Sequence, residues 1–147
     1  MLENKNILIT GATGFIGYNL AKYLARTNAV YCIVRKLSNL DKLINIPNIK
    51  FIYFDSDISK FTNSLSAVNF DLVYHLASLF IAEHQSENIS DLIDSNIKFP
   101  TQLLDALHLT QAKVRVINTG TAWQNYHNSS YNPTCLYAAT KQASEDI

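Results

Sequence analysis

The run Gly11-Ala12-Thr13-Gly14-Phe15-Ile16-Gly17 decides the fold, because it directly follows the apolar residues Ile7-Leu8-Ile9. Glycines at this spacing let the backbone turn tightly, approach an anion and pack a helix on a strand. The first turn of that helix offers free N–H donors and the positive end of its dipole. The run therefore predicts a strand–turn–helix unit that binds the pyrophosphate of a dinucleotide; the alternative is a tight turn that binds nothing.

The residues after this run have helical spacing. Ile16, Leu20, Tyr23 and Leu24 recur at steps of three and four residues, so we expect them to form the apolar face of the first helix. Other helices are expected around Phe61, Leu65 and Val68, from about Ser90 through Leu107 with a kink or break at Pro100, and from Tyr137 to Ile147.

Short apolar runs alternate with these helices. They predict further strands at 30–34, 51–54, 72–76 and 114–118. Alternating strands and helices imply an α/β fold, a Rossmann-type doubly wound parallel sheet with helices on both faces and a ligand crevice at the carboxyl ends of the strands. We expect one domain over residues 1–147, truncated, because the chain stops in a helix without an ending signal.

Composition excludes several classes of protein. The 147 residues are 48% apolar, and 12 Lys and Arg balance 12 Asp and Glu, so neither nucleic acid nor a membrane surface is an expected partner. No apolar run reaches the roughly 20 residues of a membrane span, and no signal peptide is recognisable, which favours a cytoplasmic protein. Cys32 and Cys135 are expected to be free thiols, and no metal site is predicted because the histidines lack ligand spacing.

The end of the second predicted strand carries the charge that selects the cofactor. An acidic residue there accepts from the ribose 2′-OH of NAD(H), whereas an Arg accommodates the 2′-phosphate of NADP(H). The residue is Arg35, followed by Lys36, so NADP(H) is favoured over NAD(H). The alternative is a pair of solvated loop charges.

A second group of residues lies near the end of the chain. Tyr137 and Lys141 stand four apart in a predicted helix and share one face, where the ammonium can lower the pKa of the phenol. Such a Tyr can pass a proton to a substrate. Alone, the pair could equally be a surface contact.

The order of all these motifs resembles the extended short-chain dehydrogenase/reductase family. The similarity rests on TGATGFIG at the start, Asp57-Ile58, His75-Leu76-Ala77-Ser78, Asn96, Thr119, and Tyr137 with Lys141. It covers the cofactor-binding half of that family's architecture, without the C-terminal lobe that holds most of the substrate.

The resemblance implies a role for each matching position. Tyr137 would be the general acid/base, Lys141 its pKa-lowering and ribose-binding partner, and Thr119 the hydroxyl that binds the reacting oxygen, although Thr121 is an alternative. Asn96 would steady the active-site strand. The cofactor-binding residues would be Gly11, Thr13, Gly14, Phe15, Ile16, Gly17, Arg35, Asp57, Ile58, Leu76, Ala77, Ser78, Tyr137 and Lys141. A homodimer through the Tyr137/Lys141 helix is expected on the same ground.

Two residues after Thr119 limit the reactions of this family that the chain is expected to catalyse. Dehydratases of this family carry an Asp-Glu pair after the Thr, and here the positions are Gly120 and Thr121, which leaves a ketoreductase or an epimerase. The segment 118–124 together with 136–142 is also similar to CDP-paratose and CDP-abequose synthases. That similarity implies an NADPH-dependent 4-ketoreductase of a CDP-4-keto-3,6-dideoxyhexose in lipopolysaccharide biosynthesis. An NAD-dependent nucleotide-sugar epimerase and a non-catalytic dinucleotide-binding regulator stay open.

Overall fold

A computed structural model describes residues 2–147, which divide into two compact units. The first unit comprises Met1–Ala77 and Asp105–Asn118, and the second comprises Ser78–Leu104 and Thr119–Ile147. The expectation of a single domain over residues 1–147 stays a prediction.

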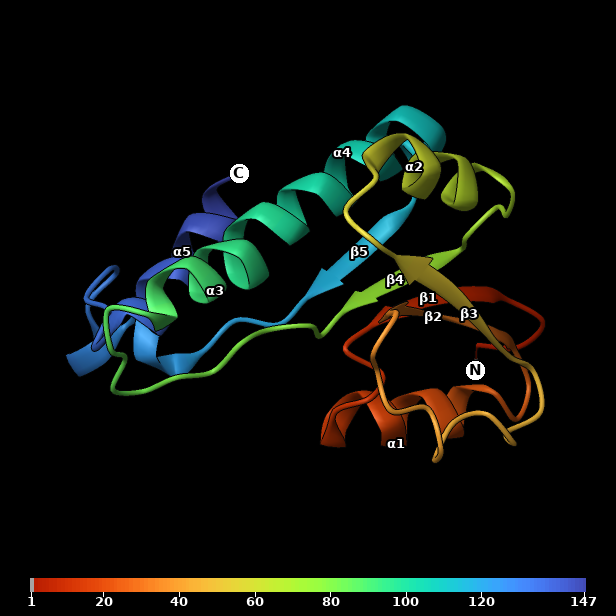
Figure 1. The fold of residues 1–147 in the computed structure, drawn as a ribbon, viewed down its shortest axis with the longest axis horizontal. Coiled ribbons are helices and arrows are strands. Elements are labelled where there is room, and N and C mark those ends of the chain that lie inside the picture. Colours follow the sequence, from red (N-terminus) through yellow and green to blue (C-terminus); the bar gives the residue numbers. More distant parts are fainter. Residues whose placement is uncertain (1) are drawn as a thin grey trace. The chain divides into compact units, whose positions relative to one another are not determined.

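The first unit is built on a parallel sheet. Within residues 2–147 its strands are β1 (Asn6–Thr10), β2 (Ala29–Arg35), β3 (Ile49–Phe54), β4 (Leu72–His75) and β5 (Arg115–Asn118), in the order β3-β2-β1-β4-β5 (Figure 1). The order reverses between β1 and β4, so the chain leaves these neighbouring strands in opposite directions along the sheet. In a doubly wound fold this reversal opens the ligand crevice. The predicted fold class is confirmed.

Helix α1 (Phe15–Leu24) covers one face of the sheet, and α2 (Ile58–Ser66) lies on the other side (Figure 1). Ile7 and Ile9 of β1 pack with α1, while Leu8 between them is also fully buried, which explains the uninterrupted apolar run. On α2, Phe61 and Leu65 are buried, as their spacing predicts.

The predicted apolar residues of α1 face the core only in part: Leu24 is buried and Leu20 packs against the core. The buried residues of α1 are Gly17, Ala21 and Leu24, whereas Ile16 is 68% and Tyr23 59% exposed. The reason is the close approach of helix to turn: a Cβ at Gly17 would meet the carbonyl oxygen of Gly11. Small residues therefore occupy the contact face near the turn, Leu20 and Leu24 contact the core further along, and Ile16 and Tyr23 turn outward.

The long predicted helix runs without a break from Asn88 to Gln111, and its hydrogen-bonding pattern changes in the middle. It consists of α3 (Asn88–Ile93), a π-helical segment Asp94–Lys98 and α4 (Phe99–Gln111). Pro100 lies in the first turn of α4 and has no N–H to donate to the preceding turn, so regular α-helical bonding cannot run through this point. The π-helical segment brings Asn96 into a buried position.

The second unit ends in α5 (Leu136–Asp146), the last predicted helix, which packs beside α3 and the π-helical segment (Figure 1). Two short 3₁₀ helices, Ala122–Gln124 and Tyr126–Asn128, precede α5. The predicted free thiols are confirmed for Cys32 and Cys135. No helix in residues 2–147 is long and apolar enough to cross a membrane.

Candidate functional site: a glycine-rich turn and a Tyr–Lys helix

Two glycines of the first unit are required by the backbone of the turn. Gly11 has φ +72°, a left-handed conformation that favours glycine, and a Cβ there would lie 2.7 Å from the backbone N of Ala77. A Cβ at Gly17 would meet the Gly11 carbonyl. At Gly14, the N-cap of α1, a Cβ would lie 3.3 Å from the Gly11 oxygen and is nearly tolerated.

Thr10 and His75 pin the residues after β4 against this turn. The Thr10 hydroxyl accepts hydrogen bonds from the backbone N–H of Leu76 (3.1 Å) and of Ala77 (3.0 Å). Both lone pairs are then used, so its single proton goes to His75 Nδ1, 2.8 Å away. His75 is thus the buried, hydrogen-bonded core histidine expected from the sequence.

Thr10 was missed by the sequence reasoning. Its position carried the signal, because Thr10 and His75 are the last residues of neighbouring strands and pair in register. Their hydrogen bonds hold Leu76 and Ala77, two predicted cofactor residues, beside Gly11.

The first turn of α1 has donors that no side chain satisfies. Its N-cap is a glycine without a side-chain hydrogen bond, and its first turn contains no acidic residue. Thr13, Gly14, Phe15 and Ile16 are all exposed, with Phe15 86% exposed. These N–H groups, at the positive end of the helix dipole and at the point where the strand order reverses, fit a diphosphate.

The remaining predicted cofactor residues of the first unit lie after β2 and β3. Arg35 ends β2 with an exposed side chain, and its backbone N–H donates to Ser38. Asp57 is the N-cap of α2, its carboxylate accepting from Lys60 N at 3.0 Å, and Ile58 begins that helix. Leu37, which no motif singled out, is 96% exposed beside Arg35 and Lys36.

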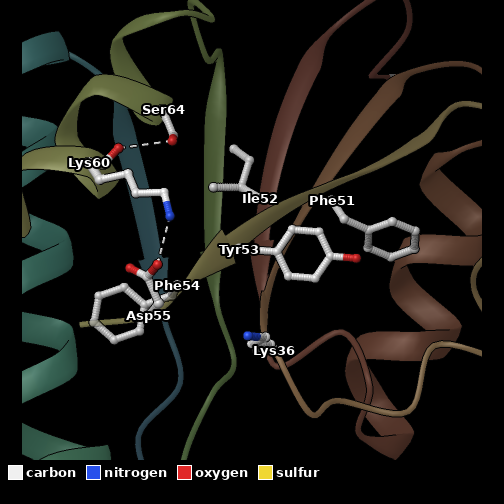
Figure 2. A pocket seen from close by; sticks show the side chains of 8 residues that line it. All are labelled: Lys36, Phe51, Ile52, Tyr53, Phe54, Asp55, Lys60 and Ser64. Carbon is white, nitrogen blue, oxygen red and sulfur yellow. Dashed lines mark hydrogen bonds and ion pairs between the residues drawn. The ribbon is translucent and has the colours of Figure 1, made fainter. Parts of the chain in front are cut away.

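A hollow of about 580 Å³ runs along the edge strand β3 and is lined by Lys36, Phe51, Ile52, Tyr53, Phe54, Asp55, Lys60 and Ser64 (Figure 2). Lys60 reaches across it to Asp55 at 2.8 Å, and this hydrogen bond lowers the pKa of the Asp55 carboxyl. None of the predicted catalytic residues lines this hollow, so we do not assign the reaction to it.

The predicted catalytic residues all belong to the second unit. Tyr137 lies half-buried in the first turn of α5, and Lys141 follows one turn later with 2% exposure. Burial lowers the pKa of Lys141, while the nearby Glu145 carboxylate opposes that shift. Tyr137 and Lys141 lie one helical turn apart on α5, as their four-residue spacing predicts.

Thr121, the alternative to Thr119, caps the short helix that follows it. The Thr121 hydroxyl accepts from Trp123 N and forms a capping box with Gln124, so it has a structural partner. Thr119 is half-buried directly after β5 and is retained as the candidate hydroxyl.

Asn96 connects the segment after β4 to α5, and both the oxygen and the nitrogen of its side-chain amide form hydrogen bonds. Its Oδ1 accepts from the hydroxyl of Ser78 (3.1 Å) and from Leu79 N (2.8 Å), while its Nδ2 donates to the Leu79 carbonyl (2.9 Å) and to Thr140 Oγ1 (3.1 Å). Thr140 in turn donates to the Tyr137 carbonyl at 2.8 Å. Asn96 therefore fixes the backbone around Tyr137. The hydroxyl proton of Ser78, a predicted cofactor residue, is donated to Asn96.

Gln124 is a second buried connector that sequence reasoning missed. Its Oε1 accepts from Thr121 N at 2.7 Å, and its Nε2 donates to Gln142 and Glu145 of α5. Glu145 also fills the space at Gly120, where a Cβ would lie 2.6 Å from its Oε1. No group of three or more His, Cys, Asp or Glu residues within 2–147 could hold a metal ion.

Comparison with known proteins identifies the family. Residues 7–147 match the model of the NAD dependent epimerase/dehydratase family, and the chain belongs to that family. It is 32% identical over 161 residues to a trifunctional UDP-glucose 4,6-dehydratase/UDP-4-keto-6-deoxy-D-glucose 3,5-epimerase/UDP-4-keto-L-rhamnose-reductase of Arabidopsis thaliana, covering 96% of this chain and 24% of that protein.

Solved structures share the fold. The UDP-Glc/GlcNAc 4-epimerase of Campylobacter jejuni superposes with a TM-score of 0.86 at 20% identity, over 97% of this chain and 47% of that chain. The UDP-glucuronic acid 4-epimerase of Bacillus cereus, in complex with NAD, gives 0.74 at 25% identity, over 96% and 50%. The chain thus spans a quarter to a half of the length of these proteins.

Proposed function

We propose that this chain is the cofactor-binding and catalytic part of an NADPH-dependent oxidoreductase that reduces the keto group of a nucleotide sugar. The observation that carries the proposal is the buried Lys141 one helical turn from Tyr137, in a member of a family described as NAD dependent. A buried ammonium is costly and seldom kept without a functional reason. The curated plant relative, whose name includes a reductase of a keto sugar, supports the same chemistry.

The glycine-rich turn and the Tyr–Lys helix have different roles in the proposed reaction. The turn between Gly11 and Gly17 binds the pyrophosphate through the N–H groups of α1, because no side chain caps these donors and the absence of Cβ atoms at Gly11 and Gly17 lets the turn pack closely on the neighbouring backbone. When bound, the dinucleotide supplies the hydride. Thr119 donates a hydrogen bond to the carbonyl oxygen of the substrate, and Tyr137 gives its phenolic proton to the alkoxide that forms, leaving a phenolate stabilised by the Lys141 ammonium.

Two sequence features support reduction over the other reactions of the family. Gly120 and Thr121 provide no acid and base for dehydration, and Thr121 is engaged in a cap. Arg35 at the end of β2 favours the 2′-phosphate of NADPH, the cofactor that a reductase draws from solution. The substrate we propose is a CDP-4-keto-3,6-dideoxyhexose of lipopolysaccharide biosynthesis.

The test is an assay of the intact protein with that keto sugar, following NADPH absorbance, with NADH as the second arm. We expect oxidation of NADPH, its loss in Tyr137→Phe, and a preference for NADH in Arg35→Asp. If no nicotinamide is oxidised while UDP-sugars interconvert, the reductase proposal is wrong.

An epimerase is the second candidate, because the solved neighbours carry that name. An epimerase returns the hydride to its own substrate, so the bound cofactor is regenerated and none is taken up from solution. Homodimerisation through α5 belongs to the same proposal, and sedimentation of the intact protein measures it. A protein that binds dinucleotide but turns over no sugar, with Tyr137→Phe unchanged, would be a regulator.

A further inference from the structure

The ring of Phe80 contacts two other aromatic rings, those of Tyr137 and Trp123. Phe80 stands edge-on to Tyr137, with ring centroids 4.9 Å apart and an interplanar angle of 90°, and lies 5.5 Å from Trp123. Yet Phe80 is 58% exposed and Trp123 40% exposed. We call Phe80 and Trp123 the aromatic wall. Rings placed only to stabilise the fold would be buried, because their contribution comes from the area that they remove from water.

The aromatic wall is held in place by polar contacts on both sides. Asn96 binds the N–H and the C=O of Leu79, the residue before Phe80, and also Thr140 of α5. Trp123 is held by the Thr121 hydroxyl at its N–H and by Thr134 N at its carbonyl, 3.1 Å away. The backbone at both rings is thus fixed before any ligand arrives, with Phe80 against Tyr137 and Trp123 against Phe80, which is what a binding surface requires.

The chemistry of the wall selects its ligand. A pyranose ring has faces made of C–H groups, and aromatic side chains bind such faces. A hydroxyl turned towards Phe80 would lose its hydrogen bonds to water without replacement, whereas a C–H or methyl group loses none.

We propose that Phe80 and Trp123 bind the hexose ring of the nucleotide sugar and select a sugar that lacks a hydroxyl on the carbon facing Phe80. This inference rests on the proposed function, since it makes the wall part of the site at which Tyr137 works. It assigns to Phe80 a role in specificity, distinct from the proton transfer of Tyr137.

Calorimetry of the intact protein with NADPH bound tests the wall. The ligands are CDP, a CDP-hexose with all its hydroxyls and a CDP-6-deoxyhexose. For Phe80→Ala we expect affinity for the CDP-6-deoxyhexose to fall about tenfold, with affinity for CDP and for NADPH unchanged. Phe80→Tyr should restore most of the loss. Tyr131→Ala is the matched control, because Tyr131 is 57% exposed on the same unit.

Three results would overturn the inference. If the wild-type protein binds the CDP-sugars and Phe80→Ala binds them equally well, the wall has no sugar-binding role although the proposed function stands. If Phe80→Ala weakens CDP as much as the CDP-sugars, the wall binds the nucleotide instead. If the wild-type protein binds NADPH but no nucleotide sugar, the proposed function fails and the inference fails with it.

Discussion

The carboxylate of Glu145 accepts a hydrogen bond of 2.9 Å from the side-chain amide of Gln124. This contact joins α5, which carries Tyr137 and Lys141, to the segment that carries Thr119. Because the same Gln124 also accepts from Thr121 N, it fixes the backbone two residues after Thr119.

Replacing Gln124 with Leu should therefore separate these elements. The change leaves the partly buried N–H of Thr121 without its side-chain acceptor, which costs about 1–3 kcal/mol of the free energy of unfolding. We expect this loss in urea unfolding, together with a lower kcat at little change in KM. Glu145→Gln keeps an acceptor for Gln124 and is the control; equal losses in both variants would contradict the account.

Alanine at Gly11 and at Gly14 should have different effects. Gly11→Ala places a Cβ 2.7 Å from the backbone of Ala77 at a positive φ, so we expect a lower melting temperature and a loss of NADPH affinity of at least about tenfold. Gly14→Ala meets only one oxygen at 3.3 Å and should retain the wild-type melting temperature. Fluorescence titration with NADPH and thermal melts measure both; similar behaviour of the two variants would contradict the geometry of the turn.

Lys141 should reduce stability at neutral pH while serving catalysis. Its pKa is lowered below the ordinary 10.5 by burial, so the native state binds the proton less tightly than the unfolded chain does. The loss of folding free energy caused by the buried ammonium is fully present below the native pKa. It decreases as pH rises from that pKa to 10.5.

We therefore expect Lys141→Met to raise the free energy of unfolding at neutral pH, by an amount that shrinks in alkaline buffer, and to abolish turnover. Urea unfolding across this pH range measures it. If Lys141→Met is less stable than the wild type at neutral pH, burial of the ammonium does not destabilise the native state.

The two thiols should differ in reactivity. Cys32 is fully buried in β2, and burial raises its pKa to about 12, so it should resist alkylation in the native protein. Cys135 is partly exposed before α5 and should react. Mass spectrometry should find a single alkyl group on the native protein and a second after denaturation; rapid modification of Cys32 would indicate that the sheet opens.

The strands could be predicted because a parallel sheet buries both faces and leaves runs such as Ile7-Leu8-Ile9 without polar residues. The face of α1 could be predicted only in part, since its first turns depend on how closely Gly17 approaches Gly11, a contact that periodicity does not contain. Pro100 indicated a kink or break in the long helix, whereas the helix continues there through a π-helical segment.

The candidate site could be predicted only where chemistry is local in sequence. Tyr137 and Lys141 are four residues apart, and helical spacing alone places them on one face. Asn96 and Thr140 are 44 positions apart and Gln124 and Glu145 are 21 apart, so only the folded chain brings them together. Phe80 had no motif at all, and its contact with Tyr137 appears only in the structure.

The most direct test of the central claim is transfer of deuterium from NADPH labelled with deuterium at C4 of the nicotinamide to the nucleotide sugar, measured by mass spectrometry of the sugar product. The account predicts that the product of the intact protein carries the label and that Tyr137→Phe forms none. A sugar product formed without label would contradict reduction by NADPH and favour the epimerase.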